Sequence, residues 1–422
     1  MGEATTKAEQ ARQATIAMAK LGSAARNTAL ESLSKALLEQ DEYLIVENNK
    51  DIDAARKLGT PEPLIDRLLL TPMRLRGISA ALQQLALEKD PLGELVGGRT
   101  LYNGIQLRQV RVPLGVVAII YEARPNVTAD AAGLCLKTGN VCLLRGGSLA
   151  SHSNIAMTKV LYEAGVAAGL PEYWLQSIET VERAATVELM QLRGLVDVLI
   201  PRGPASLIQS TIENSKVPVI ETGAGNCHLY VHEDVRSEIV VPIMLNAKTQ
   251  RPGVCNAIES LLIDECIAER ELPALLKALF ASRVLVHGDE TAAALAGEIM
   301  GSDRFFVPAN DEDWGREYLD LEISVKCVSG LDEAIGHINR YSTHHSESIL
   351  SENHEAIKRF FAEVDSATVY ANASTRFTDG GEFGLGAEIG ISTQKLHARG
   401  PMGLAALTST KFLLDGDGQI RG

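Results

Sequence analysis

Apolar and polar residues alternate with two different periods along the chain. Between residues 5 and 90, apolar residues recur at i, i+3, i+4 and i+7, which predicts a run of amphipathic helices. Gly59 is suited to end one of these helices, and Thr60-Pro61 to begin the next. From residue 113 onward, short apolar runs alternate with helical stretches. These runs predict strands at 115–121, 141–146, 196–203, 217–222, 227–234, 258–264, 283–288, 323–329, 346–352 and 367–374.

The alternation of strands and helices is typical of an α/β protein with parallel sheets and right-handed crossovers. Ten strands fit two sheets better than one. We therefore expect two parallel-sheet domains, with a boundary near residue 225 in the glycine-rich GAGN segment.

The segment RTLYNGIQLRQVRVP differs from its surroundings. Its Asn103-Gly104 dipeptide, flanked by partly alternating apolar and polar residues, predicts a hairpin. A hairpin between two α/β regions suggests a protruding arm. The segment after residue 400 resembles another exposed strand, which could pair with that hairpin.

Composition narrows the class of protein. Hydrophobic residues make up 45% of the chain and the net charge is −14, which favours a globular protein without a general attraction for nucleic acid or anionic membranes. Six cysteines without a C-x-x-C pair argue against a disulfide scaffold or zinc knuckle. No signal peptide or membrane span is expected, because the N-terminus is polar and the apolar runs are far shorter than roughly 18 residues. We expect a soluble protein of the reducing cytosol, the cytoplasm.

Common catalytic signatures are missing. The sequence contains no G-x-x-x-x-G-K-[ST], G-x-G-x-x-G, H-E-x-x-H or G-x-S-x-G motif. His344 and His345 are adjacent, so they do not share one face of a strand, and no carboxylate cluster accompanies them. We expect no metal site.

Cys255 is the first candidate for chemistry. In TQRPGVCNAIESLLID, Pro252-Gly253 breaks the preceding helix and a strand-like run follows, which places Cys255 at a constrained bend. A thiolate there would be reactive if a cation such as Arg251 lowered its pKa. The alternative is that Cys255 is a small buried core residue, the commoner fate of a free cysteine.

Other candidates follow predicted strands, where ligands bind in open α/β sheets. In YEARPNV, Asn126 could donate to an oxyanion and Arg124 could pair with a substrate anion, although Pro125-Asn126 also suits a plain turn. Arg145 and Ser148 in LLRGGS and Gly203 in LIPRGPAS could hold the phosphates of a nucleotide. Each of these loops alone would also suit an ordinary strand-to-helix turn.

Four segments together resemble a known family. GVVAIIYEARPN, CLKTGNVCLLRGGS, ETGAGNCHLYV and QRPGVCNA, in this order, with VSGLDEAIGHINRYSTHHSESI, resemble the gamma-glutamyl phosphate reductases of the aldehyde dehydrogenase superfamily. The resemblance covers nearly the whole chain. It implies two Rossmann-like domains and a β oligomerisation arm. The implied parts are a cofactor-binding domain at 1–100, 112–225 and 381–404, a catalytic domain at 226–380, an arm hairpin at 101–111 and an arm strand at 405–422.

The resemblance also implies an activity. It is the NADPH-dependent reduction of L-glutamyl 5-phosphate to L-glutamate 5-semialdehyde, with release of phosphate, in proline biosynthesis. The implied partners are a second copy of the chain, through the arm, and a glutamate 5-kinase that hands over the acyl phosphate. A hydrolytic aldehyde dehydrogenase and a catalytically inactive scaffold remain as alternatives.

The same resemblance assigns roles to individual residues. Cys255 is similar to the family nucleophile, and Asn126 to the amide that completes the oxyanion hole. Arg124 and Arg251 are expected to bind substrate anions. Residues expected at the cofactor are Arg145, Ser148, Gly203, Glu221 and Glu317; Glu221 matches a glutamate that activates water in hydrolytic relatives, and the local match at Glu317 is poor.

Overall fold

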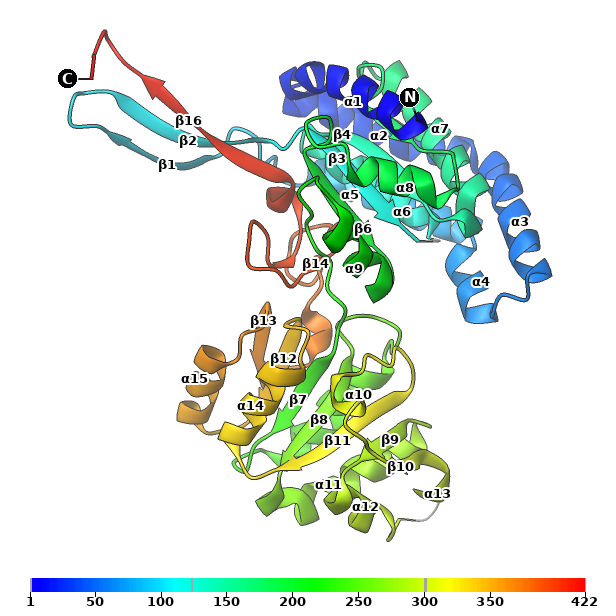
Figure 1. The fold of residues 1–422 in the computed structure, drawn as a ribbon, viewed down its shortest axis with the longest axis vertical. Coiled ribbons are helices and arrows are strands. Elements are labelled where there is room, and N and C mark those ends of the chain that lie inside the picture. Colours follow the sequence, from blue (N-terminus) through cyan, green and yellow to red (C-terminus); the bar gives the residue numbers. More distant parts are fainter. Residues whose placement is uncertain (1, 123, 300–301, 422) are drawn as a thin grey trace. The chain divides into compact units, whose positions relative to one another are not determined.

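The computed structural model describes residues 2–122, 124–299 and 302–421, and the chain divides into two compact units (Figure 1). The first unit comprises Met1–Thr222, Gly384–Gly390 and Met402–Gly422, and the second comprises Gly223–Phe383 and Ile391–Pro401. The sequence predicted a domain boundary near residue 225. It also predicted that the chain returns to the cofactor-binding domain in one uninterrupted segment, 381–404. In the structure, residues 391–401 belong to the second unit, because the backbone N–H of Gly223 donates to the carbonyl of Ile391 at 3.0 Å.

The predicted N-terminal helices are present. Gly59 adopts a φ of 70°, the left-handed conformation expected beyond a helix end. Thr71 caps the last helix of the run, since its side chain accepts a hydrogen bond from the backbone N–H of Arg74 at 3.1 Å. The helices are α1 Glu3–Lys20, α2 Ser23–Glu39, α3 Asp41–Lys57, α4 Glu62–Leu68 and α5 Pro72–Leu87.

The first unit contains a four-stranded parallel sheet in the order β5-β4-β3-β6. Its register places Tyr121 beside both Gly146 and Arg202, so β3, β4 and β6 end together at one edge. The strands are β3 Val116–Tyr121, β4 Val141–Gly146, β5 Leu175–Ser177 and β6 Val198–Arg202. The helices of this part are α6 Pro125–Lys137, α7 Ser151–Ala167, α8 Arg183–Met190 and α9 Ala205–Asn214.

The prediction of a strand at 217–222 was wrong. This segment forms only an isolated bridge between Val219 and Leu199. Pro218 accepts a hydrogen bond from Leu199 but has no N–H of its own to extend a ladder. The short strand β5 was not predicted, because three residues are too few to show a period.

The second unit contains a seven-stranded parallel sheet in the order β10-β9-β11-β8-β7-β12-β13. Alternate residues face two separate cores: Leu229 and Leu261 lie in one, and Tyr230 and Leu262 in the other. The strands are β7 Cys227–Val231, β8 Ile258–Asp264, β9 Leu285–Gly288, β10 Phe306–Pro308, β11 Glu322–Val328, β12 Ser346–Leu350 and β13 Thr368–Ala371.

Helices cover both cores of this sheet. The first core includes residues of α10 Ser237–Thr249, α11 Glu265–Ala281 and α12 Glu290–Ala296, and the second includes residues of α14 Leu331–Tyr341 and α15 His354–Glu363. The remaining pieces are α13 Ser302–Phe305 and the short pair β14 Ile391–Ser392 and β15 Gly400–Pro401. The 3₁₀ turns in the described residues are η1 Ser148–Ala150, η2 Asp313–Gly315, η3 Thr375–Phe377 and η4 Leu404–Leu407.

The hairpin and the last strand form one antiparallel sheet in the order β1-β2-β16, visible as a long ribbon in Figure 1. The strands are β1 Leu95–Thr100, β2 Gln106–Pro113 and β16 Thr408–Asp415. The predicted pairing of the C-terminal strand with the hairpin is confirmed, although the hairpin begins six residues before the expected start at 101, because the Gly97-Gly98 pair concealed β1. Among the described residues, no helix is long and apolar enough to cross a membrane.

Candidate active site

Cys255 lies in the loop between α10 and β8, at the bend that the sequence predicted. It is partly exposed, whereas Cys135, Cys142, Cys227 and Cys327 are buried and Cys266 is exposed on the surface. Cys255 is therefore not a sealed core residue. A cysteine in this position is held within the loop and is partly accessible.

Gly225 explains how the loop is held on one side. A Cβ added at this position would overlap the carbonyl group of Cys255, so only glycine allows the two backbone segments to approach so closely. The backbone N–H of Gly225 donates to Oε1 of Glu317 at 2.6 Å. The GAGN segment, which marked the domain boundary in the sequence, thus forms part of the support of Cys255.

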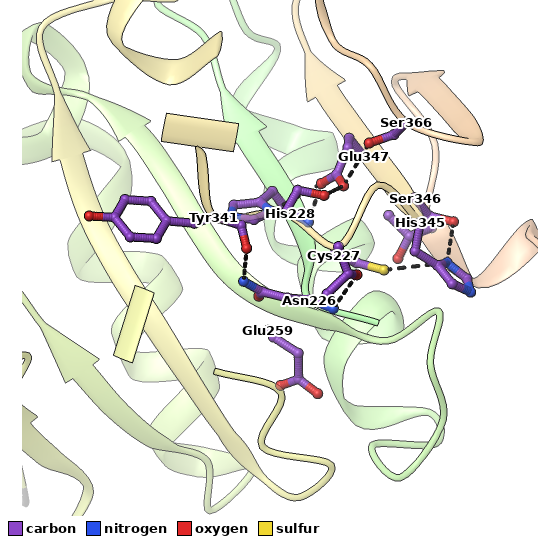
Figure 2. A network of polar contacts seen from close by, with 12 residues as sticks. Asn226, Cys227, His228, Glu259, Tyr341, His345, Ser346, Glu347 and Ser366 are labelled. Carbon is purple, nitrogen blue, oxygen red and sulfur yellow. Dashed lines mark hydrogen bonds and ion pairs between the residues drawn. The ribbon is translucent and has the colours of Figure 1, made fainter. Parts of the chain in front are cut away.

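Cys227 supports the same carbonyl from the start of β7. Its thiol donates to the carbonyl oxygen of Cys255 at 3.1 Å, and its Sγ lies 3.7 Å from Nδ1 of His345 (Figure 2). That nitrogen is also 2.9 Å from Oγ of Ser346. Burial raises the pKa of Cys227 well above its usual value, so this thiol stays protonated and remains a donor.

Asn256 holds the loop on the other side of the nucleophile. Its Nδ2 donates to the carbonyl of Thr378 at 2.8 Å, and its own carbonyl accepts from Oγ1 of Thr375 at 2.7 Å. Both threonines are fully buried. The turn η3 is therefore fastened to the residue that follows Cys255.

Two arginines lie beside this loop. Arg251 is exposed and Arg376, in η3, is half-buried. Burial lowers the pKa of Arg376, and the positive charge of Arg251 acts in the same direction, whereas Asp379 and the thiol of Cys255 act against it. Arg376 also contacts the loop directly, because its Nε donates to Oε1 of Gln250, the residue before Arg251, at 3.0 Å. The sequence analysis missed Arg376, because nothing in its local pattern marks a site.

A buried ion pair joins the elements on each side of the loop. Nζ of Lys248, near the end of α10, lies 2.5 Å from Oε2 of Glu259 in β8, and both side chains are fully buried. Oε1 of Glu259 accepts from the backbone N–H of Leu319 at 3.2 Å. Burial lowers the pKa of Lys248 and raises that of Glu259 to about 7. The pair ties α10 to β8 at the base of the nucleophile loop.

A second buried network fixes the beginning of β7. Nδ1 of His228 lies 3.0 Å from Oε2 of Glu347, whose other oxygen accepts from Oγ of Ser366 at 3.1 Å (Figure 2). Nδ2 of Asn226 donates to the carbonyl of Tyr341 at 2.9 Å. Residues 226–228 are therefore held from several directions, and Cys227 with them.

Asn126 lies in the first unit, in the first turn of α6, and is exposed. Its Nδ2 donates to Oδ2 of Asp130 one turn later, at 3.2 Å. A carboxylate only accepts, so this contact sets which way the amide points and leaves its second N–H available. Burial raises the pKa of Asp130 to about 6. Arg124 is half-buried at the N-cap of the same helix.

Comparison with known proteins identifies the family. The model of the aldehyde dehydrogenase family matches residues 2–296. A gamma-glutamyl phosphate reductase of Clostridium botulinum is 51% identical over 100% of both chains, and one of Thermobifida fusca is 51% identical over 98% of this chain and 97% of its own. This chain belongs to the gamma-glutamyl phosphate reductase family.

The solved structures agree with this assignment. The crystal structure of gamma-glutamyl phosphate reductase from Thermotoga maritima aligns over 100% of both chains, with a TM-score of 0.96 and 43% identity. An acetylating aldehyde dehydrogenase from Geobacillus thermoglucosidasius shares the fold alone, with a TM-score of 0.68 and 19% identity. The expected α/β fold of the aldehyde dehydrogenase type is thereby confirmed, and the family is one of oxidoreductases that use a nicotinamide cofactor.

The edge where β3, β4 and β6 end has features that suit such a cofactor. A Cβ on Gly146 would overlap the amide of Asn154, and one on Gly203 would lie 2.9 Å from a methyl group of Leu207, so the side chains of Asn154 and Leu207 pack closely against these two loops. Nδ2 of Asn154 is buried without a hydrogen-bond partner in the described part of the chain. Glycine-containing loops at the ends of parallel strands and an unsatisfied buried donor are compatible with a nucleotide at this edge.

The other expected cofactor residues lie in different surroundings. Ser148 is exposed and begins the turn η1 ahead of α7, so it does not open α7 itself. Arg145 is 8% exposed, and its guanidinium donates to the carbonyls of Gly146 at 2.9 Å and Val181 at 2.8 Å. Burial lowers the pKa of Arg145. The guanidinium of Arg145 is thus bonded mainly to backbone carbonyl groups of its own unit.

The two glutamates lie in different units. Glu221 is half-buried in the first unit. Glu317, in the second unit, accepts the hydrogen bond from Gly225, and burial raises its pKa. Glu317 therefore contacts the segment that supports Cys255.

Proposed function

We propose that this protein reduces L-glutamyl 5-phosphate to L-glutamate 5-semialdehyde with NADPH and releases inorganic phosphate, as a step of proline biosynthesis. The observation that carries the proposal is the partly exposed thiol of Cys255 on a loop held by Gly225, Cys227 and Asn256, in a chain of this family. A rigidly held and accessible thiol is the part that acyl transfer requires.

The first step is attack of the Cys255 thiolate on the acyl carbon. A carbon–sulfur bond forms, and the carbon–oxygen bond to phosphate breaks, so phosphate leaves with the electron pair. Asn126 and the backbone N–H of Cys255 donate to the oxyanion of the tetrahedral intermediate. Preorganised donors of this kind stabilise the transition state more than the ground state.

The product of this step is a thioester on Cys255. When bound, the nicotinamide cofactor supplies the hydride that reduces it. Asn126 stabilises the oxyanion again. The resulting hemithioacetal collapses to the aldehyde and returns the thiolate of Cys255 for another turnover.

Several further assignments belong to this proposal. Arg145, Ser148, Gly203, Glu221 and Glu317 are the residues assigned to the cofactor, and NADPH rather than NADH is the proposed form. Arg124 and Arg251 bind the anionic groups of the substrate. The arm of β1, β2 and β16 joins copies of the chain in a homo-oligomer, which acts in the cytoplasm and receives its labile substrate from a glutamate 5-kinase.

The reaction run in the oxidative direction tests the proposal. With L-glutamate 5-semialdehyde and NADP⁺, the wild-type protein should form NADPH only when inorganic phosphate is present, and NAD⁺ should be the poorer oxidant. Turnover without phosphate would instead indicate a hydrolytic aldehyde dehydrogenase.

Variants of two cysteines test which thiol is the nucleophile. Cys255→Ala should abolish turnover, whereas Cys266→Ala, at an exposed thiol, should leave it unchanged. A Cys255→Ala protein that retains normal rates would contradict the thioester mechanism. A wild-type protein without activity whose Cys255 reacts with iodoacetamide no faster than Cys266 would indicate a scaffold.

A further inference from the structure

The turn η3 carries a cation to the rim of the nucleophile loop. Thr375 and Thr378 both bond to Asn256, so the backbone of the turn is fixed to the residue after Cys255. The carbonyl of Arg376, between them, accepts from Nδ2 of Asn256 at 3.4 Å. The position of Arg376 is therefore set by the same bonds that hold the nucleophile.

The side chain of Arg376 is also directed toward this loop. Its Nε donates to Oε1 of Gln250 at 3.0 Å, and Gln250 directly precedes Arg251. Asp379 is the nearby carboxylate that acts on Arg376, and its Oδ1 accepts from the backbone N–H of Gly381 at 2.9 Å. An exposed cation, Arg251, and a half-buried one, Arg376, thus belong to the segments that adjoin Cys255.

Without a bound anion, the placement of Arg251 and Arg376 near each other is energetically unfavourable. The guanidinium groups repel each other, and Arg376 loses part of its hydration. The chain as a whole carries a net charge of −14, so its general field does not attract an anion. Local cations must therefore provide the binding, and guanidinium is the group that binds phosphate in a bidentate manner.

The substrate offers two anionic groups to this position. Its phosphate is joined through one oxygen to the carbon that Cys255 attacks, whereas three carbons separate its α-carboxylate from that carbon. Arg376, which is bonded to Gln250 and to the residue after Cys255, and Arg251, in the same loop as Cys255, are therefore placed for the phosphate. We infer that Arg376, together with Arg251, binds the phosphate of the acyl phosphate and stabilises it as it leaves.

This inference deepens the proposed function and rests on it. As the bond between carbon and oxygen breaks, the departing phosphate gains negative charge. Arg376 offsets that charge without taking or giving a proton, because guanidinium stays protonated. In the oxidative direction, the same residue binds the inorganic phosphate that attacks the thioester.

Kinetics in the oxidative direction separate the two anions. Arg376→Ala should raise KM for phosphate by roughly 10- to 100-fold, the usual effect of losing a charged hydrogen bond, with KM for the semialdehyde within about twofold. Arg376→Lys should be intermediate, because it keeps the charge but not the planar fork. Arg236→Ala removes an exposed arginine of the same unit, paired with Glu352, and should change neither constant.

Two results would overturn the inference. One is an unchanged KM for phosphate in Arg376→Ala. The other is an increase confined to the semialdehyde, which would assign Arg376 to the α-carboxylate. Failure of the proposed function is seen separately, because it requires the wild-type protein to lack phosphate-dependent turnover.

Alkylation of Cys255 provides a readout that needs no cofactor. In the wild-type protein, anionic iodoacetate should label Cys255 faster relative to neutral iodoacetamide than it labels the exposed Cys266, as measured by peptide mass spectrometry. Inorganic phosphate should suppress that preference. Arg376→Gln should lose the preference while both thiols remain reactive toward iodoacetamide; a preference that survives would refute the anion site even if the alanine variant does not fold.

Discussion

The two units carry their candidate chemistry in different ways. In the first unit, Asn126 and Ser148 lie in the first turns of α6 and η1 and are exposed, and the side chain of Asn126 donates to Asp130 within its own helix. In the second unit, the segments on both sides of Cys255 are fastened by buried groups, among them Cys227 and Asn256.

This difference matches the roles proposed for Ser148 at the cofactor and for Cys255 as the nucleophile. A residue that binds a dissociating ligand can lie on an accessible edge. A nucleophile must keep one geometry through bond formation, hydride transfer and release, and small displacements are costly for such steps. Substitutions in the support of Cys255 should therefore be more damaging than matched substitutions in the first unit.

The largest effect is expected for Gly225→Ala. The added Cβ would overlap the carbonyl of Cys255 and displace the nucleophile loop. We expect kcat to fall by about 100-fold or more, as a displacement of roughly 1 Å can cause. The matched control is Gly77→Ala in α5, where a Cβ meets nothing within 4 Å and activity should not change. Near-normal kcat in Gly225→Ala would show that the loop tolerates displacement.

A substantial loss of stability is expected for Lys248→Met. It leaves the carboxylate of Glu259 buried without its partner, which typically costs about 3–5 kcal/mol of unfolding free energy. Lys35→Met in α2 removes an exposed pair with Glu39 and should cost less than about 0.5 kcal/mol. Urea unfolding measures both, and the double variant Lys248→Met/Glu259→Leu should recover most of the loss. Equal losses of unfolding free energy in Lys248→Met and Lys35→Met would contradict the expectation that the buried pair of the second unit contributes more stability than the exposed pair of the first.

A smaller loss of stability is expected when the pH is lowered. Burial lowers the pKa of His345 to about 4, below its ordinary value of 6.5, so folding keeps it neutral. The unfolded chain binds a proton below pH 6.5; the stability that neutral His345 contributes is therefore complete above that pH and is lost as pH falls toward 4. From pH 7 to pH 5 we expect a loss of about 1–2 kcal/mol.

Tryptophan fluorescence can assign this loss to a unit. The chain has two tryptophans, Trp174 in the first unit and Trp314 in the second, so Trp174→Phe leaves a reporter of the second unit alone. In that background, His345→Gln should reduce the difference in urea midpoint between pH 7 and pH 5. His152→Gln, at the exposed histidine of the first unit, should not. An unchanged difference in His345→Gln would exclude this histidine as the cause.

Much of the fold was predictable from local pattern. Many strands of the two parallel sheets have strong apolar runs, as in GVVAIIY. Such a continuous apolar run is typical of a strand that is buried on both faces in a parallel sheet. The segment 217–222 has the same composition but includes Pro218, and only its neighbours decide whether it extends a sheet. The β1 strand could not be recognised because Gly97-Gly98 interrupts its alternation.

The site was predictable in part. Cys255 stands out because Pro252-Gly253 breaks a helix immediately before it, and the resemblance to the family gave it a role. Gly225 was visible only as part of a glycine-rich segment, since its close approach to Cys255 is a contact between residues distant in sequence. Cys227 lies in the hydrophobic core of the second unit. Its hydrogen bond to Cys255 follows from strand register, which no local pattern shows.

The order in which the chain is made has a consequence for the first unit. This unit contains residues from both ends of the chain, and β2 pairs with β16, whose last residue is Asp415. During synthesis, the N-terminal helices and β2 leave the ribosome long before their final partner exists. The edge of β2 is then open to incorrect pairing until translation ends, so a ribosome-bound chaperone that shields extended segments should improve the yield of native protein.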